Sequence, residues 1–373
     1  MSLDPAAALE LGTVRVVGTG LLGASVGLGL SASGARVLLA DVSPTALALA
    51  RDLGAGSPDD GQQHADLVVV AAPPDVTAAV VLEELKAHPD AVVTDVASVK
   101  AGVLEALRAA GADLTNYVGS HPMAGRERSG AVAARGDLFL GRPWVLSPVD
   151  GGDPAALATV RRLALALGAV PVVMPAAEHD EAVALVSHVP QVAASLVAAR
   201  LRHAPDAAVA LAGQGLRDVT RIAGSDPALW AQILAANAGP VAAVLAELRD
   251  DLDRVLDALG ALAGENPGDG PAVGARGAVA HVVADGNLGR ERIPGKHGGV
   301  PARYAVVTVV IPDEPGALGR VFADIAAAGT TVEELALEHA PGRAVGLLEI
   351  SVLPAVREHL TEALSASGWH VVA

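Results

Sequence analysis

Residues 14–23 read Val-Arg-Val-Val-Gly-Thr-Gly-Leu-Leu-Gly. The run 14–17 predicts a buried strand, and the segment that begins at 21 has the apolar pattern of a helix. The glycines between them permit a tight turn, close approach of the backbone to a pyrophosphate, and close packing of helix on strand. The helix N-terminus attracts the negative charge of such a group. We therefore expect a dinucleotide-binding turn made by Gly18, Gly20, Leu21, Leu22 and Gly23.

The flanking sequence extends this turn into a whole α/β domain. Short apolar runs alternate with longer helical stretches, which indicates a Rossmann-like parallel sheet covered on both faces. The domain is expected to span residues 1–175. Its predicted strands are 14–17, 36–40, 67–71, 91–94, 117–119, 144–147 and 170–173, and its predicted helices are 21–31, 44–53, 76–86, 99–109 and 154–167.

Asp41 follows the second predicted strand, where a carboxylate accepts hydrogen bonds from a ribose diol. It would repel a 2′-phosphate, and Val42 and Ser43 offer no arginine for one, so NAD is favoured over NADP. Ala72 and Pro73 follow the third strand at the carboxyl edge of the sheet, where ligands of open parallel sheets bind.

The rest of the chain divides into three parts. Residues 176–263 read as an all-helical domain, broken near 204–205, 213–215 and 224–227, with one face buried against another subunit. Residues 264–301 are rich in Gly, Pro and charge and predict a linker, although an apolar run at 279–283 leaves an ordered segment open. Residues 302–373 predict a βαββαβ order of the ferredoxin-like kind.

Composition excludes several classes of function. The chain has 373 residues, a formal charge of −16, no cysteine, and only three Trp, two Tyr and two Phe. Such charge and so few aromatic rings argue against a nucleic-acid partner. Without cysteine there is no disulfide or cysteine–zinc site, and we expect no metal. The N-terminus lacks a basic region before an apolar stretch, and no uncharged apolar run approaches ~20 residues, which predicts a cytoplasmic protein with no membrane span.

Several polar residues stand where the fold alone does not require them. Ser98 follows the fourth strand and is either a site residue or the N-cap of the next helix. His121 ends a strand, held by a following proline, although a histidine satisfied in the core is an alternative. His188 and Gln191 share a helix face beside Pro190, which lacks a backbone donor. The four-residue spacing of Arg217 and Arg221 suits either a solvated pair or the binding of a dianion.

Together these motifs resemble a known family, the TyrA group of prephenate and arogenate dehydrogenases with a C-terminal ACT regulatory domain. The resemblance covers nearly the whole chain. It rests on six motifs in the family's order, at 18–23, 95–100, 119–125, 187–190, 217–223 with Trp230, and 313–318.

The resemblance implies NAD-dependent oxidative decarboxylation of prephenate to 4-hydroxyphenylpyruvate and CO2 in tyrosine biosynthesis. Hydride leaves C4 of the cyclohexadienol ring while the hydroxyl on C4 loses a proton, for which a neutral imidazole is a suitable acceptor. By match to the family's motifs, His121 is this acceptor, Ser98 positions the hydroxyl, and Arg221 binds the ring carboxylate. The substrate-binding set is completed by Glu127, His188, Gln191, Arg217 and Trp230. The family's pocket lies at the interface of a homodimer.

Two positions depart from the family pattern. Gln191 stands where many relatives carry a second histidine, and its neutral amide favours prephenate over arogenate, whose ammonium would prefer a carboxylate. The asparagine common in ligand-binding ACT domains is absent from 329–332. The resemblance implies tyrosine as the effector, whereas the missing asparagine leaves a purely structural, dimerising role as the alternative.

Three other functions remain open at this point. The chain could prefer arogenate, could be a related β-hydroxyacid or imine dehydrogenase, or could be a non-catalytic NAD-binding sensor joined to an ACT domain. The last two would not require His121 together with Arg221.

Overall fold

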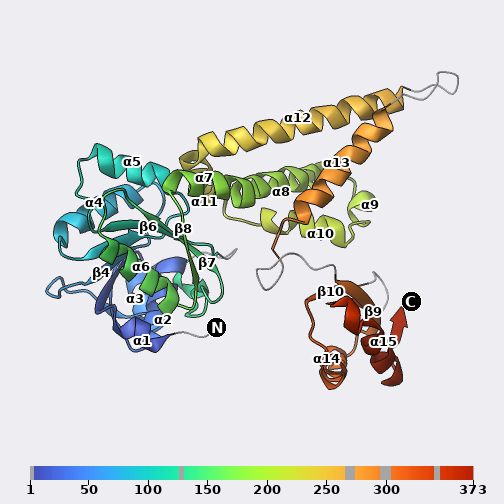
Figure 1. Ribbon diagram of the computed structural model, residues 1–373, viewed down its shortest axis with the longest axis horizontal. Helices are drawn as coiled ribbons and strands as arrows, with labels where there is room; N and C mark the ends of the chain where they lie inside the picture. Colours follow the sequence, from blue (N-terminus) through green and yellow to red (C-terminus); the bar gives the residue numbers. More distant parts are fainter. Residues whose placement is uncertain (1–3, 126–129, 265–273, 295–303, 340–344, 373) are drawn as a thin grey trace. The chain divides into compact units, whose positions relative to one another are not determined.

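The computed structural model describes residues 4–125, 130–264, 274–294, 304–339 and 345–372. The chain forms two compact units, Met1–Leu248 and Arg249–Ala373. The first unit holds a sheet with its helices followed by a run of further helices, and the second ends in a small sheet with two helices (Figure 1).

The first unit is built on an eight-stranded sheet with the strand order β3-β2-β1-β4-β5-β6-β7-β8. All the predicted strands form, and the two-residue strand β3 is an addition. The strands are β1 (Thr13–Val17), β2 (Arg36–Ala40), β3 (Ser57–Pro58), β4 (Leu67–Val70), β5 (Val92–Asp95), β6 (Tyr117–Pro122), β7 (Pro143–Pro148) and β8 (Val170–Val173).

Strand β7 corrects the prediction of an all-parallel sheet. It runs antiparallel to β6, with His121 opposite Val145. The described part of the connection between them carries only the 3-10 turn η1 (Ala131–Ala133), whereas a parallel return needs a long crossover, usually a helix. The sheet is therefore mixed at this edge and parallel elsewhere.

Capping signals in the sequence set where several helices begin. Helices α1 (Pro5–Leu9), α3 (Pro44–Asp52) and α6 (Pro154–Ala166) start with a proline, which is suited to the first helical position. The residue before each proline accepts hydrogen bonds from first-turn amides through its side chain. The other helices around the sheet are α2 (Leu21–Ala32), α4 (Thr77–Ala87) and α5 (Ala101–Ala109).

The sheet is covered on both faces, as its apolar strands predict. One hydrophobic cluster includes Leu30 of α2 and Leu163 of α6, and another includes Val81 of α4 and Leu107 of α5. All four residues of β4 are buried, which is typical of a central parallel strand.

Helices follow the sheet from residue 176 onward. The breaks near 204–205 and 224–226 fall where the sequence predicts them, the one predicted at 213–215 lies slightly earlier, at 210–213, and a further break at Asn237 was not predicted. The elements are α7 (Ala176–Val183), the π-helical turn η2 (Ala184–His188), α8 (Val189–Arg200), the 3-10 turns η3 (Leu201–His203) and η4 (Arg221–Ala223), α9 (Asp206–Val209), α10 (Gln214–Thr220), α11 (Pro227–Ala236) and α12 (Ala238–Ala263).

The continuous run Ala176–His203 has 28 residues, and an 18-residue window within it has a mean hydropathy of 1.6, so by length and hydropathy it could span a membrane. This differs from the expectation that no apolar run is long enough. The run nevertheless holds the buried polar residues His179, Asp180, His188 and Gln191, all hydrogen-bonded within the protein. Buried, hydrogen-bonded polar residues of this kind suit a helix with one face packed against the rest of the protein.

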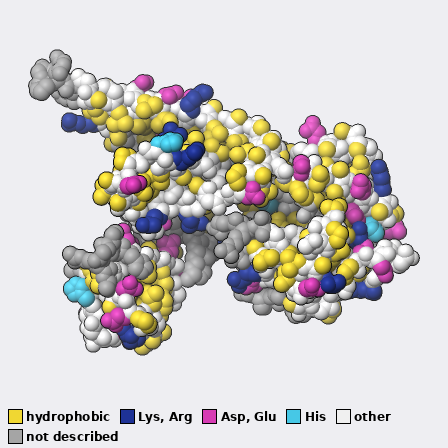
Figure 2. Space-filling model, turned by 180° about the vertical axis from the view of Figure 1, so that it is seen from behind, with side chains coloured by type: hydrophobic (Ala, Val, Ile, Leu, Met, Phe, Trp, Pro, Cys, Tyr) yellow, Lys and Arg dark blue, Asp and Glu magenta, His cyan; other side chains and the backbone are white. Residues whose placement is uncertain are grey.

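Hydrophobic side chains lie exposed along this helical part of the chain (Figure 2). They include Leu185, Val186, Leu196, Val197 and Leu229. Exposed apolar side chains in such number are typical of surfaces that contact other proteins.

The C-terminal part of the second unit has the predicted βαββαβ order. Its four-stranded antiparallel sheet has the order β10-β11-β9-β12 and packs against two helices around a separate core. The elements are β9 (Ala305–Pro312), α14 (Ala317–Ala327), β10 (Glu334–His339), β11 (Val345–Val352), the 3-10 turn η5 (Pro354–Val356), α15 (Arg357–Ala366) and β12 (His370–Val372).

The segment predicted as a linker contains a helix, α13 (Ala275–Arg290). It begins after Gly274, whose φ of 93° is in the left-handed region. The apolar run at 279–283 lies within it, so this part of 264–301 is ordered.

Candidate active site

The turn between β1 and α2 has the backbone that its glycines predict. Gly18 has a φ of 93°, and a Cβ there would overlap the carbonyl oxygen of Ala71. A Cβ on Gly23 would overlap the carbonyl oxygen of Gly18. A Cβ on Gly20, by contrast, would meet no protein atom within 4 Å. Two of the glycines therefore close the turn, and the third leaves open space beside the helix N-terminus, as a pyrophosphate requires.

Asp41 follows β2 and faces the same turn. Its Oδ2 accepts hydrogen bonds from the backbone N (2.6 Å) and Oγ1 (2.7 Å) of Thr19, and its Oδ1 accepts one from the backbone N of Ser43 (2.8 Å). These contacts orient the carboxylate, whose remaining lone pairs can accept from a diol. This oriented acceptor thus fits the adenosine ribose of NAD.

The other predicted cofactor residues flank this turn. Leu21 and Leu22 are half-buried in the first turn of α2, and Ala72 and Pro73 lie in the loop after β4, the neighbour of β1. Thr77 Oγ1 donates to the carbonyl oxygens of Ala72 (3.1 Å) and Pro73 (2.9 Å), which holds that loop beside the turn.

His121 lies in β6, beyond the residues of β6 that pair with β5, at the carboxyl edge of the parallel strands. Its Nδ1 is 2.8 Å from Nε2 of His179 in α7. Burial, followed by the nearby charges of His179, Lys100 and His188, lowers the pKa of His121 well below its usual value of 6.5. The imidazole is therefore neutral at pH 7 and able to accept a proton.

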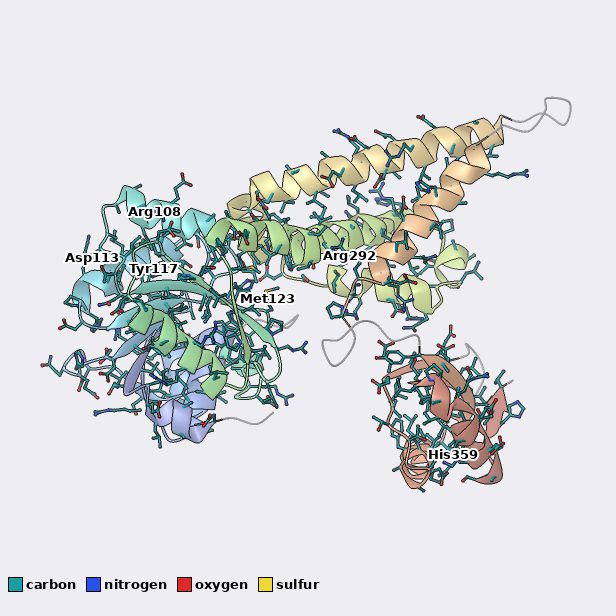
Figure 3. All side chains as sticks on the ribbon, in the orientation of Figure 1. Arg108, Asp113, Tyr117, Met123, Arg292 and His359 are labelled. Carbon is teal, nitrogen blue, oxygen red and sulfur yellow. The ribbon has the colours of Figure 1, made fainter. Side chains whose placement is uncertain are left out.

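A buried polar cluster lies close to His121. The Lys100 ammonium pairs with Asp95 Oδ1, and the Tyr117 hydroxyl donates to Asp95 Oδ2 (2.7 Å). Figure 3 shows Tyr117 inside the α/β part. Burial lowers the pKa of Lys100, whereas burial and Asp95 raise the pKa of Tyr117 well above 10.0. A Cβ on Gly119 would lie 3.2 Å from the Tyr117 oxygen, so a side chain there would crowd the cluster.

Ser98 lies half-buried in the loop between β5 and α5. The alternative interpretation, in which it caps the helix, is wrong. Helix α5 begins at Ala101, two residues later than predicted, and its first amides donate to Asp180 instead. Ser98 remains a candidate for the site.

His188 is the last residue of the π-helical turn and is buried. Pro190 follows it at the start of α8 and supplies no backbone N–H. Asn237 Nδ2 donates to the carbonyl oxygen of Asp180 (2.8 Å) and to His188 Nδ1 (3.0 Å). Nδ1 is thus the acceptor, and the proton of neutral His188 is on Nε2. Trp230 stands edge-on to this ring, with centroids 6.0 Å apart.

Gln191 is buried one turn further along the helix. Its amide lies between the Ser195 hydroxyl (Nε2–Oγ, 3.4 Å) and the Ser225 hydroxyl (Oε1–Oγ, 3.3 Å). Ser225 also donates to the Ile222 carbonyl oxygen (2.7 Å), which joins Gln191 to the segment that carries the two arginines.

Arg217 in α10 and Arg221 at the start of η4 have exposed side chains. Among the described residues, neither arginine forms an ion pair. Both α10 and η4 pack against α8, the helix of Gln191. Glu127, the remaining predicted pocket residue, lies outside the described residues.

Sequence reasoning missed the residues that support the histidines. His179, Asp180 and Asn237 are buried, but each looks like an ordinary polar residue of an amphipathic helix. Lys100 and Asp95 belong to the 95–100 motif, but the sequence does not show that they form a buried ion pair.

Comparison with known proteins places this site in a family. Residues 26–173 match the family model for the nucleotide-binding domain of prephenate dehydrogenase, and residues 175–266 match the model for its dimerization domain. A protein of Streptomyces niveus described as a probable prephenate dehydrogenase is 40% identical over 360 residues, which cover 96% of this chain and 98% of that protein.

Solved structures give the same result. Prephenate dehydrogenase from A. aeolicus, in complex with hydroxyphenyl propionate and NAD+, is 25% identical with a TM-score of 0.64 and covers 76% of this chain and 98% of its own. Synechocystis arogenate dehydrogenase is 25% identical with a TM-score of 0.61 and covers 75% of this chain and 99% of its own. The chain thus belongs to the prephenate dehydrogenase (TyrA) family.

Proposed function

We propose that the chain is an NAD-dependent prephenate dehydrogenase, which converts prephenate to 4-hydroxyphenylpyruvate and CO2 in tyrosine biosynthesis. The observation that carries the proposal is the position of His121, a half-buried neutral imidazole at the carboxyl edge of the parallel strands. A non-catalytic NAD-binding sensor would not need such a base. A relative of like length, 40% identical, bears a prephenate dehydrogenase name, which supports the same substrate.

Each group of residues has a defined task in this reaction. NAD, when bound, accepts hydride from C4 of the substrate. The β1–α2 turn and Asp41 hold the cofactor, with Ala72 and Pro73 beside them. His121 takes the proton of the C4 hydroxyl, and Ser98 positions that hydroxyl. Loss of CO2 then makes the ring aromatic, and this drives the step forward.

The substrate carries two carboxylates, and the proposal assigns cations to them. Arg221 binds the ring carboxylate until it leaves as CO2, and Arg217 lies on the preceding turn. Neither guanidinium is engaged by an acidic side chain of the described residues, so both are available to an anion. His188 offers an Nε2–H donor beside Trp230, and Glu127 is assigned to the same pocket by motif alone.

Gln191 supports prephenate over arogenate. Its partners are the hydroxyl groups of Ser195 and Ser225, so this position is neutral. An ammonium group in place of the keto group would find no carboxylate there. Arogenate remains the alternative substrate, since a structural neighbour of similar score is an arogenate dehydrogenase.

We further infer that the protein acts as a cytoplasmic homodimer. Residues 1–175 would bind NAD, 176–263 would dimerise and complete the substrate pocket, and 264–301 would connect them to a regulatory domain at 302–373. The exposed leucines and valines of the helical part support a subunit contact.

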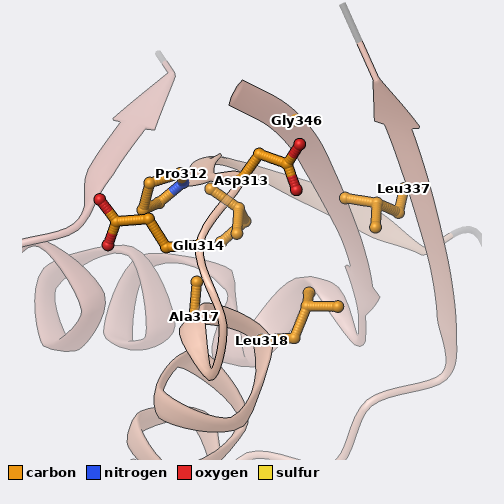
Figure 4. A pocket seen from close by; sticks show the side chains of 8 residues that line it. Pro312, Asp313, Glu314, Ala317, Leu318, Leu337 and Gly346 are labelled. Atoms are coloured by element: carbon orange, nitrogen blue, oxygen red, sulfur yellow. The ribbon is translucent and has the colours of Figure 1, made fainter. Parts of the chain in front are cut away.

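The C-terminal module is proposed to be an ACT domain that binds tyrosine. Gly316 precedes α14 with a φ of 84°, so the 313–318 motif forms a turn that opens the helix. Beside this turn lies a hollow lined by Ile311, Pro312, Asp313, Glu314, Ala317, Leu318, Leu337 and Gly346 (Figure 4). Its mixture of carboxylates and aliphatic side chains suits an amino acid, whose ammonium and apolar parts need both.

A coupled test separates the proposal from its alternatives. Formation of the reduced cofactor, NADH or NADPH, is followed with prephenate and with arogenate, each with NAD and with NADP. We expect turnover with prephenate and NAD, and His121→Asn to lower kcat on the order of 10² to 10⁴-fold with NAD binding intact. His281, an exposed histidine of α13, provides the control His281→Asn. Near-normal kcat in His121→Asn would refute the assignment of the base.

A further inference from the structure

His179 lies directly against His121 and joins two parts of the first unit. Its Nε2 is 2.8 Å from His121 Nδ1, and the rings meet edge to face at 78° with centroids 5.1 Å apart. His121 belongs to β6, whereas His179 belongs to α7. The His179 side chain is fully buried, so both of its nitrogens require partners.

Asp180 determines which nitrogen of His179 carries the proton. Its Oδ1 accepts from the backbone N of Lys100 and its Oδ2 from that of Ala101, both at 2.8 Å, at the start of α5. Both oxygens of this carboxylate thus act as hydrogen-bond acceptors. His179 Nδ1, 2.7 Å from the same Oδ1, must therefore donate. In the neutral ring, Nε2 is then the acceptor.

The donor and acceptor roles at His179 in turn determine which nitrogen of His121 carries the proton. Because His179 Nε2 accepts, His121 Nδ1 must donate, and the lone pair of His121 is left on Nε2. We propose that His179 and Asp180 are positioning residues, which hold His121 in the one tautomer whose Nε2 can take the substrate proton. This inference rests on the proposed function, because it assumes that His121 is the base.

The proton balance of the step is simple. The O–H bond of the substrate breaks, an N–H bond forms at His121 Nε2, and His121 becomes an imidazolium that still donates from Nδ1 to His179. The negative charge of Asp180 then stabilises the cation through the intervening ring, as the carboxylate does in an Asp-His pair of a hydrolytic triad.

The other charged groups around His121 make this support necessary. His179, Lys100 and His188 all oppose a positive charge on His121. Asp95 is engaged by Lys100 and Tyr117, whereas Asp180 is hydrogen-bonded through His179 to the base itself. Asp180 therefore offsets part of the cost of forming the imidazolium.

Three substitutions in the full-length enzyme test the proposal. His179→Leu removes the chain of hydrogen bonds. His179→Gln can restore its polarity, with Oε1 accepting from His121 and Nε2 donating to Asp180. Asp180→Asn can reverse it, since an amide NH2 can donate to His179 Nδ1. We expect His179→Leu and Asp180→Asn to lower kcat on the order of 10 to 100-fold, with KM for prephenate nearly unchanged, and His179→Gln to recover most of kcat.

Two readouts distinguish positioning from a merely structural role. The acid limb of kcat/KM should move to lower pH in Asp180→Asn, because the negative charge at the end of the hydrogen-bond chain from His121 is removed. Nitrogen-15 NMR of the histidines, recorded without substrate, should show His121 protonated on Nδ1 in the wild type and on Nε2 in Asp180→Asn.

His281 and Asp285 provide a matched control. They form a second His–Asp pair (3.5 Å), but their side chains are 78% and 60% exposed, so His281→Leu and Asp285→Asn should leave kcat and the pH profile unchanged. Equal kcat in His179→Leu and wild type, or an unchanged His121 tautomer in Asp180→Asn, would overturn the inference. A wild type inactive on prephenate would instead refute the proposed function, and the NMR tautomer would still report on the hydrogen bonds.

Discussion

His121 combines a common residue type with an uncommon environment. Burial and three neighbouring cationic or ionisable groups all act to lower its pKa. An exposed histidine would be half protonated near pH ~6.5, whereas His121 is neutral there.

This environment predicts the pH dependence of the reaction. The base must be unprotonated, so kcat/KM should remain on its plateau at pH 6.5 and decline only at lower pH, as His121 takes up a proton. The measurement is kcat/KM for prephenate between pH 5 and 8 in a constant-ionic-strength buffer. An acid limb centred at or above pH 6.5 would contradict it.

Gln191 is the residue where substrate choice can be altered. Gln191→Glu keeps the side-chain shape and adds a negative charge beside Ser195 and Ser225. Because the single proton of Ser225 already has an acceptor in Ile222, the new carboxylate would be left with unused acceptor capacity that an ammonium could fill. We expect the arogenate/prephenate ratio of kcat/KM to rise. Gln191→Asn serves as the neutral control, and a ratio that stays the same or falls in Gln191→Glu would count against the assignment.

In the turn between β1 and α2, Gly23 is needed for close backbone packing, whereas Gly20 leaves space for the cofactor. Gly23→Ala would force a Cβ into the Gly18 carbonyl oxygen, whereas Gly20→Ala meets no protein atom and keeps an ordinary φ of −70°. We expect Gly23→Ala to lower the melting temperature sharply, and Gly20→Ala to fold normally but bind NAD more weakly, because its methyl occupies the space beside the pyrophosphate. Calorimetric titration with NAD and thermal denaturation of both variants check this. Unchanged NAD affinity in Gly20→Ala would show that the cofactor lies elsewhere.

How far sequence could predict these elements depends on how local their causes are. The glycine turn, the proline-led helices α3 and α6, and the strands other than β3 follow from neighbouring residues, and they form as predicted. Helix α1 was not predicted. The direction of β7 follows from a connection whose described part has no crossover helix, and the burial of His179 and Asp180 follows from the docking of α7 on α5. Such contacts between distant segments leave no periodic pattern in a single sequence.

The π-helical turn Ala184–His188 is an element whose cause is partly visible in the sequence. Pro190 lacks the N–H that a regular helix would use, and the break falls directly before it. The irregular turn brings His188 to Asn237 and Trp230. The motif at 187–190 therefore supplies the His188 side chain and also Pro190, which favours the π-helical turn that orients this side chain.

The proposed ACT domain predicts how the whole enzyme responds to tyrosine. Leu318 lines the hollow of the C-terminal module and is 38% exposed, whereas Leu353 is 48% exposed and lies outside the lining. Leu318→Trp should fill the hollow and raise the tyrosine concentration needed for half-inhibition, with turnover in the absence of tyrosine unchanged. Leu353→Trp is the control. Equal inhibition of wild type and Leu318→Trp, competitive with prephenate, would place the tyrosine site in the substrate pocket.

The negative net charge of the molecule makes cations near the pocket important for binding the substrate. A protein of charge −16 repels a dianionic substrate at long range. Capture must then depend on cations close to the pocket, and Arg217 and Arg221 are the candidates that carry no ion pair among the described residues.

The bond between Asp180 and the first amides of α5 has a consequence for recombining this enzyme with its relatives. The carboxylate belongs to the helical part, but the amides it binds and the histidine it aligns belong to the nucleotide-binding part. In a chimera joined near residue 175, His121 would therefore come from one parent, and the His179–Asp180 pair that orients it would come from the other. Exchange of complete domains should yield active hybrids only when the incoming helical part brings a His-Asp pair that reaches the recipient's own histidine.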